Sequence, residues 1–329
     1  MRRFQTLATC VALSTLALAL LAPATPTITP ETVYDVVQLF DFVGHTGYIR
    51  DVVFSPDGAT LASVGDDRAV RLWDLTAGDE AHVFRMPGSA AYINALSFSP
   101  DGRLLASPFG VWDLESLVAV QTWSTEVMHL AFSPDGLMLA VGAELVPVKL
   151  LDTTTWEVIR TFESLRHIAP SSDASFGFEF SPDGIWLVDG TLNEGIARVW
   201  NVEMGTFVQT LSVSGAGTDV HDVAFTADGR LLAAGGHGRS VVLFCMEDGS
   251  VERTLSLGEG TMSLDFSPDG RMLAISREGG VSLWNVETGR RLRTLSHDGA
   301  VLPVAFSSDG RFLACGVRGG HVVVWGLGE

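Results

Sequence analysis

A five-residue signature, Phe-x-x-Asp-Gly, recurs along the chain and constrains its fold more than any other feature. Successive copies are 44, 34, 48, 45, 41 and 40 residues apart. Each copy is followed by a short apolar strand, and in five of the seven copies this strand ends in Asp or Asn, such as LWD at 72–74 or VWN at 199–201. A repeat of this size indicates one structural unit used many times. The seven copies begin at Phe54, Phe98, Phe132, Phe180, Phe225, Phe266 and Phe306.

Each unit predicts four short strands. The Pro-Asp-Gly element is a strong turn signal because Pro fixes φ and Gly accepts positive φ. In the first unit an apolar strand precedes this turn at 49–54, and two more follow at 60–64 and 70–73. A later turn leads to a fourth strand, as at 291–295. The chain after the amino-terminal region has no sustained 3.6-residue apolar period, so we expect an antiparallel meander without helices.

Several predicted strands are apolar on both faces, for example 241–243 and 322–324. Such a sheet must lie between neighbouring sheets, and radial packing of seven blades provides this. We therefore expect an all-β, seven-bladed β-propeller of four-stranded antiparallel blades. The last unit has only three strands after Val301, so the strand at 36–42 should complete it and close the ring.

The chain resembles the WD40 repeat family. The resemblance rests on Gly44-His45, FSPDG at 54–58 and VRLWD at 70–74, with weaker copies over residues 36–326. Propellers of the TolB type and the YVTN family share the SPDG turn but have a different third strand, so the pattern favours WD40. The resemblance implies a non-catalytic platform that binds another protein or a peptide.

The amino terminus has the pattern of a secretory signal peptide. Arg2 and Arg3 precede a 16-residue apolar run at 7–22, which is followed by Ala22-Pro23-Ala24. We expect residues 1–24 to be a signal peptide, 25–35 a Pro/Thr-rich linker and 36–329 the propeller. This predicts an exported protein, secreted, periplasmic or on the cell surface. If the signal is not cleaved, it would tether the chain to a membrane.

Four residues of the first unit have types suggestive of a Ser-His-Asp triad, but the resemblance implies a structural role. In WD40 proteins a His, a Ser or Thr, an Asp and a Trp at these offsets form a hydrogen-bonded network that locks the turns together. We therefore expect no catalytic residues here. The residues of this structural tetrad are His45, Ser63, Asp67 and Trp73.

The resemblance places partner contacts on the face where each first strand begins. These positions lie six and four residues before each repeat Phe. The residue before the turn Asp of the first unit belongs to the same set. Tyr and Arg are frequent binding hot spots, and exposed Phe and Met can mark a binding patch. The predicted rim residues are Tyr48, Arg50, Asp66, Tyr92, Asn94, Glu126, Met128, Phe176, Asp219, His221, Met262 and Leu302.

Charge and composition limit the partner classes. The formal net charge of −18 opposes nucleic-acid binding, although seven aspartates belong to the repeat turn. The spacing of histidines and cysteines gives no metal motif, so we expect no metal and no cofactor. We expect a monomer with Cys245 and Cys315 as buried free thiols.

Two other functions are compatible with the sequence, and two segments depart from the regular repeat. A hydrolase or lyase could use Asp219 and His221 as acid and base at the channel mouth, and a tethered structural module is the other alternative. In the second unit, 107–110 compresses two strands into a short hairpin. An insertion at 163–175 precedes the fourth unit and is a functional candidate or a tolerated surface loop.

Overall fold

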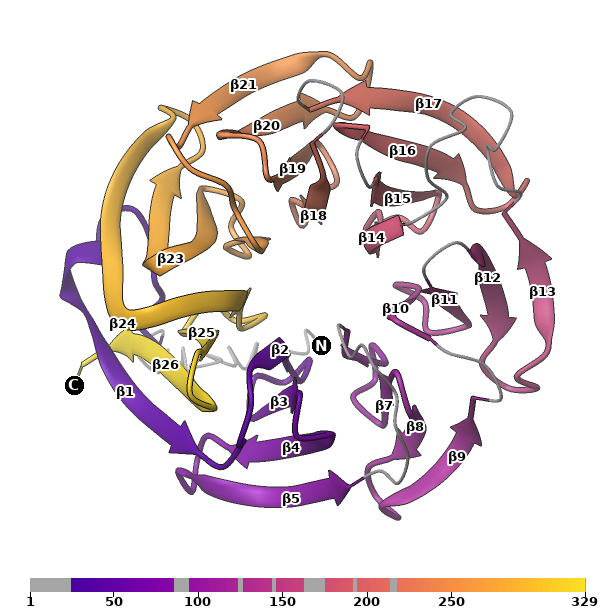
Figure 1. The fold of residues 1–329 in the computed structure, drawn as a ribbon, viewed down its shortest axis with the longest axis horizontal. Helices are drawn as coiled ribbons and strands as arrows, with labels where there is room; N and C mark the ends of the chain where they lie inside the picture. The colour runs from indigo at the N-terminus through magenta and orange to yellow at the C-terminus, as the bar shows by residue number, and fades with distance from the viewer. Residues whose placement is uncertain are drawn as a thin grey trace, which may run out of the picture.

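Seven blades of four antiparallel strands form a ring in the computed structural model (Figure 1). The structure describes residues 25–85, 95–123, 127–143, 146–162, 175–191, 194–213 and 218–328. In these ranges the one helical element is the single turn η1 (Val33–Asp35). No helix in them is long and apolar enough to cross a membrane. The predicted all-β, seven-bladed propeller is therefore confirmed.

Blades 1 to 3 each contain four consecutive strands, from the channel outward. Blade 1 comprises β2 (Ile49–Phe54), β3 (Thr60–Gly65), β4 (Ala69–Asp74) and β5 (Asp79–Arg85). Blade 2 comprises β6 (Ser97–Phe98), β7 (Leu104–Ser107), β8 (Gly110–Asp113) and β9 (Val118–Thr122). Blade 3 comprises β10 (His129–Phe132), β11 (Met138–Ala143), β12 (Val146–Asp152) and β13 (Val158–Thr161).

Blades 4 and 5 repeat this arrangement, and blades 6 and 7 share one long strand. Blade 4 comprises β14 (Ser175–Phe180), β15 (Trp186–Thr191), β16 (Ile196–Asn201) and β17 (Thr206–Ser212). Blade 5 comprises β18 (Val220–Phe225), β19 (Leu231–Gly236), β20 (Ser240–Cys245) and β21 (Val251–Ser256). Blades 6 and 7 contain β22 (Leu264–Phe266), β23 (Met272–Asn285), β24 (Arg290–Phe306), β25 (Phe312–Val317), β26 (His321–Leu327) and β1 (Val36–Val43).

The predicted closure of the ring by the first strand is confirmed. β1 pairs antiparallel with β26, from Val36 opposite Leu327 to Val43 opposite His321. The segment before β1 also packs on the propeller, since the side chains of Ile28 and Val33 are buried in the core that contains β26. Residues far apart in sequence therefore complete one blade.

The Asp-Gly turns explain why the signature recurs. In blade 1 the Ser55 hydroxyl donates a hydrogen bond of 2.6 Å to Asp57, and the Ala59 N–H donates to the same oxygen at 3.0 Å. Gly58 has a φ of +68°, which favours glycine. These hydrogen bonds, the Ser55 bond foremost, hold the pKa of Asp57 below its usual value. The turn aspartates of the other six blades accept equivalent bonds.

Blade 2 has the compressed hairpin that its sequence predicts. Ser107 pairs with Gly110, so only two residues connect β7 to β8. Both cysteines in the described part of the chain are free thiols; Cys315 is buried, whereas Cys245 is only half-buried. Of the predicted insertion at 163–175, residues 163–174 lie outside the described residues.

Candidate functional site

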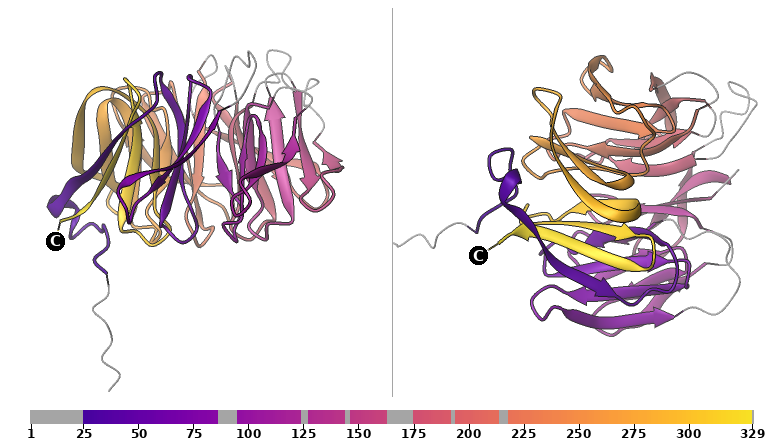
Figure 2. Two further views of the ribbon diagram at one scale, coloured as in Figure 1. Left: turned by 90° about the horizontal axis from the view of Figure 1, so that it is seen from below. Right: turned by 60° about the vertical axis from the view of Figure 1, so that its left-hand side comes forward.

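The propeller has two different faces. We call the face where the innermost strand of each blade begins the rim face, and the face with the Asp-Gly turns the turn face. β2 runs from Ile49 on the rim face toward the turn at 55–58. The amino-terminal segment contacts the turn face, where the Ile28 N–H donates a 2.8 Å bond to the Gly310 carbonyl. The indigo start of the described chain lies at this side of the disc in Figure 2.

Tyr48, Arg50, Asp66 and Arg318 form a compact group on the rim face, which we call the Tyr48 patch. The Arg50 guanidinium donates two hydrogen bonds to Asp66, at 2.6 and 2.9 Å. The guanidinium groups of Arg50 and Arg318 each lie 5.5 Å from the centre of the Tyr48 ring. The bidentate ion pair and the two cation–π contacts hold an exposed aromatic ring close to two cations.

The other predicted rim residues have different environments. Met262 is 43% exposed, so it belongs to the accessible rim. Met128 is only 8% exposed, so its side chain does not contribute to an exposed rim. Phe176 and Leu302 lie on β14 and β24. Tyr92, Asn94 and Glu126 lie outside the described residues.

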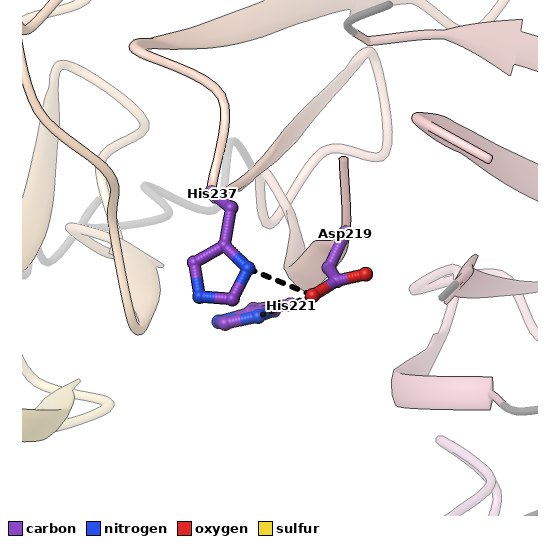
Figure 3. A group of neighbouring side chains, drawn as sticks. All are labelled: Asp219, His221 and His237. Atoms are coloured by element: carbon purple, nitrogen blue, oxygen red, sulfur yellow. Dashed lines mark hydrogen bonds and ion pairs between the residues drawn. The ribbon is translucent and has the colours of Figure 1, made fainter. Parts of the chain in front are cut away.

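Asp219 and His221 meet a third side chain, His237, at the mouth of the channel in blade 5 (Figure 3). One oxygen of Asp219 lies 2.7 Å from His237 Nδ1 and 3.6 Å from His221 Nε2. Burial, reinforced by the neighbouring His237, lowers the pKa of His221 even though Asp219 opposes this shift. His237 is not among the rim residues predicted from sequence. It lies 12 residues after its repeat Phe, the offset that selects Asp66 in the first unit.

The four tetrad residues form one continuous hydrogen-bonded chain in blade 1. Trp73 Nε1 donates to Ser63 Oγ at 2.8 Å, Ser63 Oγ lies 2.8 Å from His45 Nε2, and His45 Nδ1 lies 2.7 Å from Asp67. The side chain of His45 is fully shielded from solvent. This network holds the blade together and leaves Ser63, which is fully buried, inaccessible to a substrate.

Blade 4 achieves the same anchoring with different residues. Trp200 Nε1 donates a 2.6 Å bond to Asp189, which occupies the position of Ser63 in its unit. The carboxylate of Asp189 also pairs with the guanidinium of Arg198, and both side chains are almost completely buried. This pair was not predicted from sequence, because an Asp at the position of the tetrad Ser suggests that the hydrogen-bonded network is lost.

The channel contains a cavity of about 550 Å³ that is lined by the innermost strands of all seven blades. Four buried carboxyl groups, from Asp51, Glu179, Asp222 and Asp265, lie in its wall. Burial raises the pKa of Asp51 to about 8 and that of Asp265 to about 7. These four residues are not among those predicted from sequence, where seven other aspartates were given a place in the repeat turn. Acidic residues one or three positions before a repeat Phe were the available signal.

Comparison with known proteins gives the same class. Five segments match the family described as WD domain, G-beta repeat: residues 36–74, 80–113, 205–245, 249–285 and 289–326. Together they cover more than half of the chain. The chain therefore belongs to the WD40 repeat family, whose propellers generally serve as protein-interaction scaffolds rather than enzymes.

Three curated relatives illustrate the range of similarity. The chain is 30% identical over 142 residues to the WD repeat-containing protein SL1-17 of Schistosoma mansoni, and these residues make up 42% of this chain and 44% of the relative. It is 24% identical over 258 residues to apoptotic protease-activating factor 1 of Rattus norvegicus, covering 74% of this chain and 16% of the relative. It is 57% identical over 35 residues to small ribosomal subunit protein RACK1 of Candida albicans, covering 11% of each. The matches span less than half the length of each relative.

Proposed function

We propose that this chain is an exported, non-catalytic scaffold that binds another protein or a peptide on its rim face, centred on the Tyr48 patch. The observation that carries the proposal is that Arg50 and Arg318 both contact the Tyr48 ring, with Arg50 held by Asp66. An aromatic ring and arginines that are already ordered lose little conformational entropy on binding. Residues of these types dominate the binding energy of many interfaces.

The charge of the Tyr48 patch indicates the chemistry of its partner. Two arginines and one aspartate give the patch a formal charge of +1 on a chain whose net charge is −18. A partner that places a carboxylate and an apolar group here would gain electrostatic complementarity and cover the Tyr48 ring. We therefore expect an acidic segment of the partner to contact Arg318 and Tyr48.

Site-specific cross-linking tests the proposed face. A photo-cross-linking amino acid in place of Tyr48 should give a defined adduct in the native host, whereas the same group in place of Ile185 should not. Ile185 is a matched control, because it is an exposed apolar residue (48%) directly after an Asp-Gly turn on the opposite face. Alanine at Tyr48, Arg50 and Arg318 together should abolish the adduct partner's copurification without lowering the melting temperature by more than a few degrees. Equal cross-linking from both faces would contradict the proposal.

Export is tested separately. Residues 1–24 lie outside the described residues, and Ile28 is the first buried side chain of the described fold. Cleavage after Ala24 would therefore leave the packed segment complete. Mass spectrometry of the purified protein should give an amino terminus at Thr25. An intact Met1 would instead support the membrane-tethered alternative, and recovery from the cytosolic fraction would contradict export.

A further inference from the structure

We propose that Asp219, His221 and His237 form a binding site for Zn²⁺ or a similar divalent transition-metal ion at the channel mouth. Two imidazole nitrogens and one carboxylate oxygen are ligands that zinc commonly uses. The three ligand atoms all lie within 4.8 Å of one another and converge on one point (Figure 3). This proposal concerns a ligand that the protein-binding role of the rim does not require.

The distances between the ligand atoms are close to those of a metal site. A tetrahedral ion with bonds of about 2.0–2.1 Å separates its ligand atoms by about 3.3 Å. Here the Asp219 oxygen lies 3.6 Å from His221 Nε2 and 2.7 Å from His237 Nδ1. Side-chain shifts of less than about 1 Å would admit the ion, which would replace the proton now shared by Asp219 and His237.

The backbone segments that carry two of these ligands are held together by a hydrogen bond and by strand pairing. Asp219 and His237 are joined by a backbone hydrogen bond of 3.1 Å, from the His237 N–H to the Asp219 carbonyl, at the end of the β18–β19 pair. Gly236 lies at this junction, where a Cβ would be 2.0 Å from the Asp219 carbonyl oxygen. Glycine therefore lets the two ligand-bearing segments approach closely.

The three equivalent positions of blade 1 carry different residue types from those of blade 5. Asp219, His221 and His237 occupy the offsets held by Tyr48, Arg50 and Asp66 in the first unit. Blade 1 uses them for an Arg–Asp ion pair, which needs no metal. Blade 5 instead presents three groups that can all ligate one cation, with no fixed cation among the three to neutralise Asp219.

The cluster would hold an ion that keeps exchangeable coordination positions. The His221 and Asp219 side chains are only 17% and 13% exposed, which shields the protein side of the site. His237 is 55% exposed, so the remaining positions face solvent and would be filled by water. Structural zinc sites are closed by four protein ligands, whereas three protein ligands leave a coordination position open to water.

Calorimetric titration of the full chain, free of any purification tag containing histidine, with ZnCl₂ tests the site. We expect saturable binding of one ion per chain. His237→Ala and Asp219→Asn should each weaken binding at least about tenfold, because even the loss of outer-shell partners costs 10–100-fold in metal sites. Co²⁺ provides a second readout, since the intensity of its visible absorption should rise on binding and be lost in both variants.

His321→Ala is the matched control. His321 Nδ1 lies 2.8 Å from Asp41, so this pair resembles His237–Asp219 in its hydrogen-bond geometry but belongs to no three-ligand group in the described residues. The control should bind Zn²⁺ as the native chain does. Absence of saturable binding, or equal affinity in His237→Ala, Asp219→Asn and His321→Ala proteins of native circular dichroism, would overturn the proposal.

Discussion

The side-chain carboxyl of Asp222 on β18 accepts a 2.8 Å hydrogen bond from the backbone N–H of Leu264 on β22, across the boundary between blades 5 and 6. Bonds of the same kind run from Leu96 to Asp51, from Phe225 to Glu179 and from Phe306 to Asp265. Buried carboxyl groups thus connect adjacent blades inside the channel wall. Their energetic cost depends on their protonation state.

These carboxyl groups predict that the free energy of unfolding decreases as pH rises from 6.5 to 8.5. Burial raises the pKa of Asp51 to about 8 and of Asp265 to about 7, and it raises that of Glu179 well above 4.5. Unfolded carboxyl groups titrate near about 4, so the folded state binds more protons until the pH exceeds the folded pKa values. Stability from these groups is therefore lost with rising pH. Urea unfolding should show a loss of about 2 kcal/mol over this interval.

The interval is chosen to exclude the buried histidines. Burial lowers the pKa of His129 to about 4 and that of His221 below its usual value. Protonation of these two histidines therefore reduces the free energy of unfolding mainly below about pH 6.5, outside this interval. Asp51→Asn replaces the carboxyl group with a neutral amide, and it should flatten the pH dependence. A free energy of unfolding that is constant or rises from pH 6.5 to 8.5 would contradict the prediction.

The tetrad predicts an unequal cost for two serine substitutions. Ser63→Ala leaves both Trp73 Nε1 and His45 Nε2 without their buried partner, so we expect a loss of about 2–3 kcal/mol in the free energy of unfolding. Ser282→Ala in blade 6 removes the acceptor of Trp284 Nε1, but no histidine bond to Ser282 is lost with it. This substitution should lower the free energy of unfolding by about 1 kcal/mol. Urea unfolding of both variants measures the difference. Equal losses would show that His45 contributes nothing through Ser63.

The fold could be predicted from sequence because its determinants are local. The turn aspartates, the strand lengths and the missing fourth strand of the last blade all lie within one repeat or at the chain ends. The tetrad positions likewise follow from fixed offsets within one unit, and Asp67 and His45 are brought together by that unit alone.

Interactions between blades were not predictable in the same way. Asp51 and Leu96 are 45 residues apart and meet only because adjacent blades pack at a particular register. The repeat period indicates which face of a strand turns inward, but not which backbone group of the next blade it meets. His237 differs from these residues, because it lies in the same blade as Asp219 and at the offset that selects Asp66 in the first unit.

Ring closure predicts a large effect at one residue of β1. Phe42 is 6% exposed and its ring stacks on Trp73 of blade 1 at 4.9 Å, while β1 itself pairs in blade 7. Phe42→Ala should therefore weaken the junction between the two blades and cost about 3–5 kcal/mol. Val43→Ala, in the same strand but 66% exposed, should change stability by less than about 0.5 kcal/mol. Chemical denaturation measures both, and similar small losses would show that the stacking does not support closure.

The compressed hairpin of blade 2 predicts a strong requirement for glycine at one position. Gly110 has a φ of +148°, and a Cβ there would lie 2.3 Å from the carbonyl oxygen of Gln121 on β9. Gly110→Ala must therefore displace β9 or open the hairpin, and we expect a loss of more than about 2 kcal/mol. Gly102→Ala is the control, because its φ is +71° and the nearest atom, in Pro56, would be 3.6 Å away. In that variant only the backbone is strained, so urea unfolding should show a loss of about 1 kcal/mol in the free energy of unfolding. If Gly110→Ala costs no more than Gly102→Ala, the close approach of β8 and β9 does not constrain the blade.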